Sequence, residues 1–184
     1  VLGAREGRFN KKGETKSLVP FAASSIPLVT LGTFLLWFGW FGFNGFSQLA
    51  MGTFDDVNAI SKIAVNTHLA GAAGTVTAAV VTRLLGGKTD IVMMLNGALA
   101  GLVAITAEPL TPSPVLAIAI GAIGSLIMYF GTKFLESKKI DDVVGAIPVH
   151  MFAGIFGTLV VPLSNSGTNF GTQLTGVIAV CLFS

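Results

Sequence analysis

The stretch Val143–Leu163, VVGAIPVHMFAGIFGTLVVPL, contains a single ionisable side chain, that of His150. As a helix rising about 1.5 Å per residue, it would reach roughly 30 Å, the thickness of a bilayer's hydrocarbon core. It therefore predicts a membrane-spanning helix. Because an imidazole is costly at that depth, we expect His150 to face protein or a water-accessible lumen rather than lipid. From this stretch alone, a transport site and a structural histidine bonded to a neighbouring helix are equally open.

The composition of the whole chain agrees with a membrane location. Hydrophobic residues make up 52% of the chain, charged residues 11%, and the mean hydropathy is +0.79, whereas an average soluble domain is roughly 25% charged. We therefore predict an all-α, polytopic membrane protein. The net charge of +2 is small and no basic–aromatic pattern accompanies it, which argues against a nucleic-acid partner. The single cysteine, Cys181, can form no internal disulfide.

Polar loops divide the chain into a series of apolar stretches. We predict five complete spans and the beginning of a sixth, preceded by a cytoplasmic loop at 1–19, with all of them forming one transmembrane domain. A polar loop with Asp55, Asp56 and Lys62 is expected between the first two spans. Val1 in place of an initiator methionine and the short last stretch suggest a fragment of a longer protein. The spans are predicted at 21–49, 63–85, 91–107, 115–135, 143–163 and 172–184.

The basic residues predict the orientation of these spans. When the loops are assigned alternately to the two sides, one side receives ten of the eleven Lys and Arg residues and the other only Lys62. The positive-inside rule places the basic loops in the cytoplasm. The aromatic cluster between Trp37 and Phe46, and Asp55 and Asp56, then lie at the outer face.

The residues that could carry chemistry are few. No motif for a metal, a phosphate or a nucleophile is present, so we expect neither an enzyme nor a cofactor. Every carboxylate falls in a loop or at a helix end, and Asp141 and Asp142 are expected to cap the His150 helix. His68 receives no transport role. Gly97 and Gly101 have the GxxxG spacing that indicates tight helix packing.

His150 and the outer aromatic rings suggest complementary parts of a mechanism. Burial in an apolar lumen favours a neutral imidazole, which suits a small neutral polar solute. Aromatic faces attract a partly desolvated cation by about 0.5–2 kcal/mol, whereas moving a bare ion into the core costs several kcal/mol or more. These properties suit a permeant that can shed a proton.

Five segments of the chain, in order and at their spacings, resemble the ammonium transporter family. The resemblance covers nearly the whole chain. The segments are LGAREGRF at Leu2–Phe9, WFGWFGFNG at Trp37–Gly45, VNTHLAGAAG at Val65–Gly74, NGALAGLVAIT at Asn96–Thr106 and DDVVGAIPVHMFAGIFGT at Asp141–Thr158.

This resemblance implies a fold of eleven spanning helices, ten of them an inverted repeat of five plus five, assembled as a homotrimer with one pore per subunit. The chain would supply the second half. It also implies recruitment of ammonium outside, deprotonation near a gate, and passage of ammonia past two histidines. The membrane would be the plasma membrane or a bacterial inner membrane, and a cytoplasmic nitrogen-regulatory protein is a possible partner.

Particular residues match the family's functional positions. His150 matches the second pore histidine, and Phe43 matches one ring of the phenylalanine gate. Ser47 matches the hydroxyl of the outer recruitment site, and Thr106 a hydroxyl near the gate that we group with it. Trp40 and Leu99 match positions lining the narrow pore.

The sequence departs from the family pattern at three positions. Gly145 replaces an aspartate, Met151 a glycine, and Phe46 a small residue beside Ser47, which puts the pore width near His150 and the room at the recruitment site in question. Two alternatives stay open. The chain could be the ammonium-sensing module of a signalling protein with a cytoplasmic output domain, or an unrelated channel or secondary transporter in which His150 is purely structural.

Overall fold

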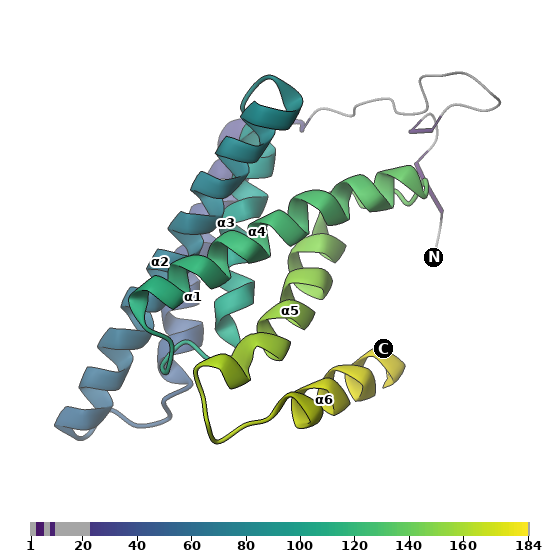
Figure 1. Cartoon of the computed structure of the whole chain (residues 1–184). Helices are drawn as coiled ribbons and strands as arrows, with labels where there is room; N and C mark the ends of the chain where they lie inside the picture. The colour runs from purple at the N-terminus through teal and green to yellow at the C-terminus, as the bar shows by residue number, and fades with distance from the viewer. Residues whose placement is uncertain (1–2, 6–7, 10–22, 184) are drawn as a thin grey trace.

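The computed structural model of the chain describes residues 3–5, 8–9 and 23–183. Most of the predicted loop at 1–19, the first two residues of the predicted span at 21–49, and Ser184 lie outside the described residues. Within the described part, every regular element is a helix (Figure 1). The predicted all-α class is confirmed.

The first two helices are α1 (Ile26–Phe46) and α2 (Phe54–Gly86). The hydroxyl of Ser25 caps α1 by accepting from the backbone N–H of Leu28 at 3.4 Å, so this helix begins later than the predicted residue 21. Thr53 and Asp56 form a capping box, which starts α2 well before the predicted residue 63. The predicted polar loop with Asp55, Asp56 and Lys62 was therefore wrong from Phe54 onward, because this segment is helical.

The next two helices lie close to their predicted limits. Helix α3 (Ile91–Thr106) begins where the Asp90 carboxylate accepts from the N–H groups of Val92 and Met93. Helix α4 (Pro114–Ser137) has the Ser113 hydroxyl as its N-cap and Pro114 in its first turn, where the missing N–H of proline is tolerated.

The stretch around His150 is not the single regular helix that the sequence predicted. Residues 143–145 form bends, followed by the π-helical segment η1 (Ile147–Phe152), the helix α5 (Ala153–Val160) and the 3-10 turn η2 (Val161–Leu163). Pro148 has no N–H to donate within the helix, and Gly145 has a φ of +78°. The prediction failed because both features interrupt the regular α-helical pattern. Helix α6 (Phe170–Phe183) closes the chain and lies against α5.

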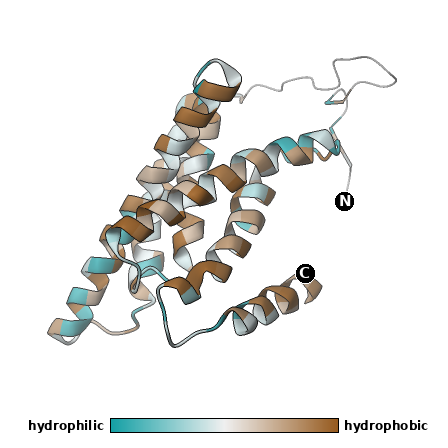
Figure 2. Ribbon diagram, in the orientation of Figure 1, coloured by the Kyte–Doolittle hydropathy of each residue, from teal (hydrophilic) through white to brown (hydrophobic). Residues whose placement is uncertain are grey.

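Three of the described helices are long and apolar enough to cross a membrane by length and composition, namely α1, α2 and α4. The predicted spans at 91–107, 143–163 and 172–184 correspond to shorter apolar helical segments. Figure 2 shows apolar residues over most of the helices, with polar residues gathered in the first turns of α2 and at the end of α4.

Small residues join α2, α3 and α4 into the packed centre of the structure. A Cβ added to Gly74 would collide with the carbonyl oxygen of Gly97, and one added to Gly101 or Gly121 would collide with that of Ala70. The hydroxyl of Ser125 donates to the carbonyl oxygen of Gly74 at 2.8 Å. The predicted tight packing at Gly97 and Gly101 is confirmed.

Candidate functional site

The candidate site residues come from three parts of the fold. Trp40 and Phe43 lie on α1, and Ser47 follows its last residue. Leu99 and Thr106 lie on α3, which contacts both α1 and η1, the segment that carries His150. Helix α3 therefore links the two ends of the predicted pore path.

A hydrogen-bonded chain fixes Trp40 against α3. Its indole N–H donates to the hydroxyl oxygen of Thr106 at 2.7 Å, and that hydroxyl donates to the carbonyl oxygen of Leu102 at 2.6 Å. The Trp40 and Phe43 rings lie 6.0 Å apart between centroids, inclined by 60°. The structure thus brings three predicted site residues together and engages the Thr106 proton within the protein.

The end of α1 has one side buried against α2 and one side exposed. Asn44 is 1% exposed, and its amide donates to the hydroxyl oxygen of Thr67 on α2 at 3.0 Å. Phe43, the residue before it, is 66% exposed. Ser47 is also exposed, and its hydroxyl donates to the carbonyl oxygen of Phe43 at 2.9 Å. Since that bond uses its proton, the Ser47 oxygen presents lone pairs outward and can accept hydrogen bonds.

The residues before His150, Pro148 and Val149, are buried, but His150 and the following Met151 are exposed. Val149 is 2% exposed and belongs to a cluster with Met128 and three alanines, against which Leu99 packs. The His150 side chain is exposed on the surface of the described chain. The segment therefore buries one side in the bundle and presents the imidazole on the other.

His68, to which we assigned no role, lies beside the aromatic residues of α1. Its ring is 5.6 Å from that of Trp37 and 6.2 Å from that of Phe41, centroid to centroid. Because α2 begins at Phe54, His68 lies near the middle of this helix.

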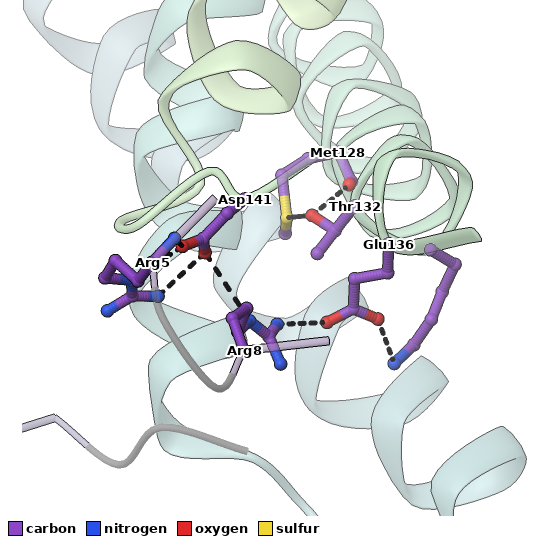
Figure 3. Close-up of polar contacts among 7 residues, drawn as sticks. Arg5, Arg8, Met128, Thr132, Glu136 and Asp141 are labelled. Atoms are coloured by element: carbon purple, nitrogen blue, oxygen red, sulfur yellow. Dashed lines mark hydrogen bonds and ion pairs between the residues drawn. The ribbon is translucent and has the colours of Figure 1, made fainter. Parts of the chain in front are cut away.

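The two adjacent aspartates before η1 have different partners, although both were predicted to be caps. Asp142 does act as one, because its oxygens accept from the backbone N–H groups of Ala146 and Ile147 at 3.0 and 2.7 Å. Asp141 instead binds Arg5, through the guanidinium at 2.7 and 2.8 Å and the backbone N–H at 2.9 Å (Figure 3). The side-chain and backbone hydrogen bonds from Arg5 hold the pKa of the Asp141 carboxyl well below its usual range.

Sequence reasoning missed one polar residue near His150. The side-chain amide of Asn96 on α3 donates to the carbonyl oxygen of Val144 at 3.1 Å. Asn96 was noted only as the first letter of a family segment. The residues that it joins are 48 positions apart, and a contact between such distant positions leaves no local signal.

The model of the Ammonium Transporter Family matches residues 1–179. The chain belongs to this family. Family membership makes it part of a multi-pass membrane protein, and the family is one of transporters rather than of enzymes.

Individual relatives support this family assignment. It is 42% identical over 168 residues to ammonium transporter Amt2 of Archaeoglobus fulgidus, with 91% of the chain and 34% of the relative covered. It is 41% identical to a putative ammonium transporter of Synechocystis, covering 98% of the chain and 34% of the relative. The chain therefore spans about a third of the length of these curated relatives.

Solved structures share the fold. A structure described as Sensor Amt Protein superposes with a TM-score of 0.86 at 36% identity, covering 96% of this chain and 45% of that one. The crystal structure of Candida albicans Mep2 gives a TM-score of 0.79 at 29% identity, covering 88% of this chain and 39% of Mep2.

Proposed function

We propose that the chain forms one side of the pore of an ammonium transporter, which recruits ammonium at the outer face and passes ammonia along a path that includes His150. One observation carries the proposal. Phe43, Ser47 and His150, which match functional positions of the family, are exposed, whereas their neighbours Asn44 and Val149 are buried. An exposed imidazole at membrane depth needs a cover of protein or water. The rest of the transporter would supply it.

The outer part of the path suits a cation that donates hydrogen bonds. Ammonium has four N–H groups and no acceptor, and the lone pairs of the Ser47 oxygen can accept from them because its own proton is bonded to Phe43. The faces of Trp40 and Phe43 would add about 0.5–2 kcal/mol of cation–π attraction. Thr106 contributes by orienting the Trp40 ring through their hydrogen bond.

The inner part of the path suits the neutral molecule. Carrying a bare ion into an apolar interior costs several kcal/mol or more. Ammonium would therefore pass its proton to solvent water near the Phe43 gate and continue as ammonia. Leu99 offers an apolar wall beside the His150 segment. A neutral imidazole can accept from ammonia with one nitrogen and donate to it with the other.

Uptake of radiolabelled methylammonium by the full-length protein tests this role. We expect His150→Ala to reduce uptake or to alter the preference between ammonium and methylammonium. His68→Ala is the matched control, since it removes the other histidine of the chain and should leave both properties unchanged. Unchanged uptake and unchanged preference in His150→Ala would remove His150 from the mechanism.

The proposal extends to the assembly. We infer that the full-length protein is a homotrimer surrounded by membrane lipid and that a cytoplasmic nitrogen-regulatory protein can bind it. The mass of the purified protein in detergent, measured by light scattering, tests the trimer. A monomeric mass with intact transport activity would contradict it.

A second candidate function is ammonium sensing. The likeness to Sensor Amt Protein, at a TM-score of 0.86, favours it specifically. The full-length sequence discriminates between the two functions. A soluble signalling domain following the membrane part would favour sensing, and a short tail would favour transport.

A further inference from the structure

We propose that Asn96 and Asp142 are positioning residues that set the direction of the His150 side chain, an inference that rests on the proposed pore role of His150. Neither residue has to touch the permeant. Both bind the backbone immediately before the histidine, at the point where the helix departs from regular geometry.

The contact of Asn96 replaces a hydrogen bond that Pro148 cannot make. In an α-helix, the N–H of residue 148 would donate to the carbonyl oxygen of residue 144. Pro148 has no N–H, which leaves the carbonyl of Val144 without this donor. The side-chain amide of Asn96 donates to it instead, at 3.1 Å. A side chain from α3 thus completes the backbone bonding of the segment that carries His150.

Asp142 satisfies the other orphan groups at this end. The first N–H groups of a helix have no acceptor within the helix. Asp142 supplies one carboxylate oxygen to Ala146 and the other to Ile147, at 3.0 and 2.7 Å. Because a charged acceptor makes stronger hydrogen bonds than a neutral one, these two bonds restrain rotation of the first turn.

Gly145 lies between the two contacts and is closely packed against Asn96. Its φ of +78° is a left-handed conformation, and a Cβ at this position would lie 2.7 Å from the amide nitrogen of Asn96. The Asn96 side chain therefore packs directly on the glycine that turns the chain into η1. A shift of Asn96 would move this turn.

The opposite side of η1 is fixed by packing. A Cβ on Gly131 of α4 would collide with the ring of Phe152 and meet Pro148 at 3.1 Å. Val149 is buried in its cluster at 2% exposure. Polar contacts on one side and close packing on the other hold η1 in place, and His150 and Met151, between Val149 and Phe152, stay exposed.

The loop that carries Asp142 is itself anchored. Arg5 holds Asp141 with both its guanidinium and its backbone N–H, and Arg8 lies 3.5 Å from Asp141 and 3.3 Å from Glu136 on α4 (Figure 3). The Asp141 side chain is only 2% exposed. With Asp141 committed to the arginines, Asp142 is held in place to cap the segment.

The experiment measures ammonium and methylammonium transport by the full-length protein in proteoliposomes, normalised to folded protein. We expect Asn96→Leu and Asp142→Ala to reduce the transport rate roughly ten-fold and to change the ratio of the two substrates. This reduction is smaller than the roughly hundred-fold that a displacement of about 1 Å can cost an organised site. Asp142→Asn keeps one acceptor oxygen and should give an intermediate effect. This milder variant also serves if Asp142→Ala does not fold.

Asp90→Ala is the matched control, because Asp90 also accepts from two backbone N–H groups, at the start of α3. It should lower stability without changing the substrate ratio. In a His150→Ala background, Asn96→Leu and Asp142→Asn should have no further effect on the ratio, since a residue that acts through His150 loses its action with it.

The outcomes separate the two proposals. If His150→Ala alone changes nothing, the proposed function fails. If His150→Ala alters transport but Asn96→Leu and the two Asp142 variants leave the substrate ratio unchanged, or if their effects add to that of His150→Ala, the positioning role is wrong.

Discussion

The centre of the bundle and the face that carries the candidate site are built in opposite ways. Helices α2, α3 and α4 meet through glycine and alanine, with Gly74 against Gly97 and Gly121 against Ala70 at backbone contact. Phe43 and His150 instead lie on exposed surface. Within an 18-residue apolar stretch of each helix, 44% of the residues of α4 are buried inside the bundle, but only 6% of those of α1.

This difference shows that one region of the chain holds the helices together and another presents the candidate site. Lipid is as apolar as leucine, so helices in a membrane associate mainly through close packing, and small residues allow the closest approach. The residues at the centre of the bundle are already buried by one another. The site face consists of large or polar side chains whose cover must come from lipid, water or the rest of the transporter.

Substitution of a central glycine should have the largest effect. A valine at Gly74 would place its Cβ on the carbonyl of Gly97, with backbone rather than a flexible side chain in the way. We expect a loss of folded protein, corresponding to about 3 kcal/mol or more. The yield and thermal unfolding of the full-length protein in detergent measure it. Gly86→Ala is the control, because nothing lies within 4 Å of the added methyl group.

A methyl group at Gly145 should have the next largest effect. Two costs add, because the left-handed backbone alone costs about 1–3 kcal/mol for a non-glycine residue and the new Cβ meets Asn96. Gly87 has a φ of +75° and nothing within 4 Å. The difference in thermal stability between Gly145→Ala and Gly87→Ala therefore isolates the Asn96 contact. Equal destabilisation of the two variants would contradict close packing there.

Loss of the Thr106 hydroxyl should have a smaller effect. In Thr106→Val, the Trp40 N–H loses its acceptor, which costs about 1 kcal/mol in unfolding free energy. Methylammonium uptake should fall as well, because the Trp40 ring is no longer oriented. Thr30→Val removes only a hydrogen bond within α1, to Ile26, and should leave uptake unchanged. A reduction of the same size in both variants would mean that Thr106 does not act through Trp40.

The smallest effect is expected at the Arg5–Asp141 pair. Because binding to Arg5 lowers the pKa of Asp141 in the folded protein, the pair contributes stability above the ordinary aspartate pKa of about 3.9. This contribution is lost as the pH falls toward the lower folded value. Asp141→Asn should thus reduce thermal stability by a constant amount between pH 5 and 8, and by less in acid. A difference that grew in acid would contradict the ion pair.

Much of the scaffold could be predicted from local sequence. Asp90 and Pro114 mark the starts of α3 and α4, and Gly97 and Gly101 indicate a packed interface. The early start of α2 also has a local signal, since Thr53 and Asp56 have capping-box spacing, but the aspartates were interpreted as a loop.

The surroundings of His150 could not be predicted in the same way. The pattern of apolar residues predicts a helix through 143–163, whereas the irregular turn at Gly145 depends on Asn96, 48 residues from Val144. The partner of Asp141 is Arg5, 136 residues away. Contacts of this kind are decided by tertiary packing, which periodicity does not encode.

The structure of the full-length protein in a lipid bilayer, determined by electron cryo-microscopy, tests the central claim most directly. The account predicts that Phe43 and His150 line one passage, and that residues of the full-length protein other than these 184 complete its wall. An imidazole in contact with acyl chains, or a Phe43 ring remote from the passage that His150 lines, would contradict it.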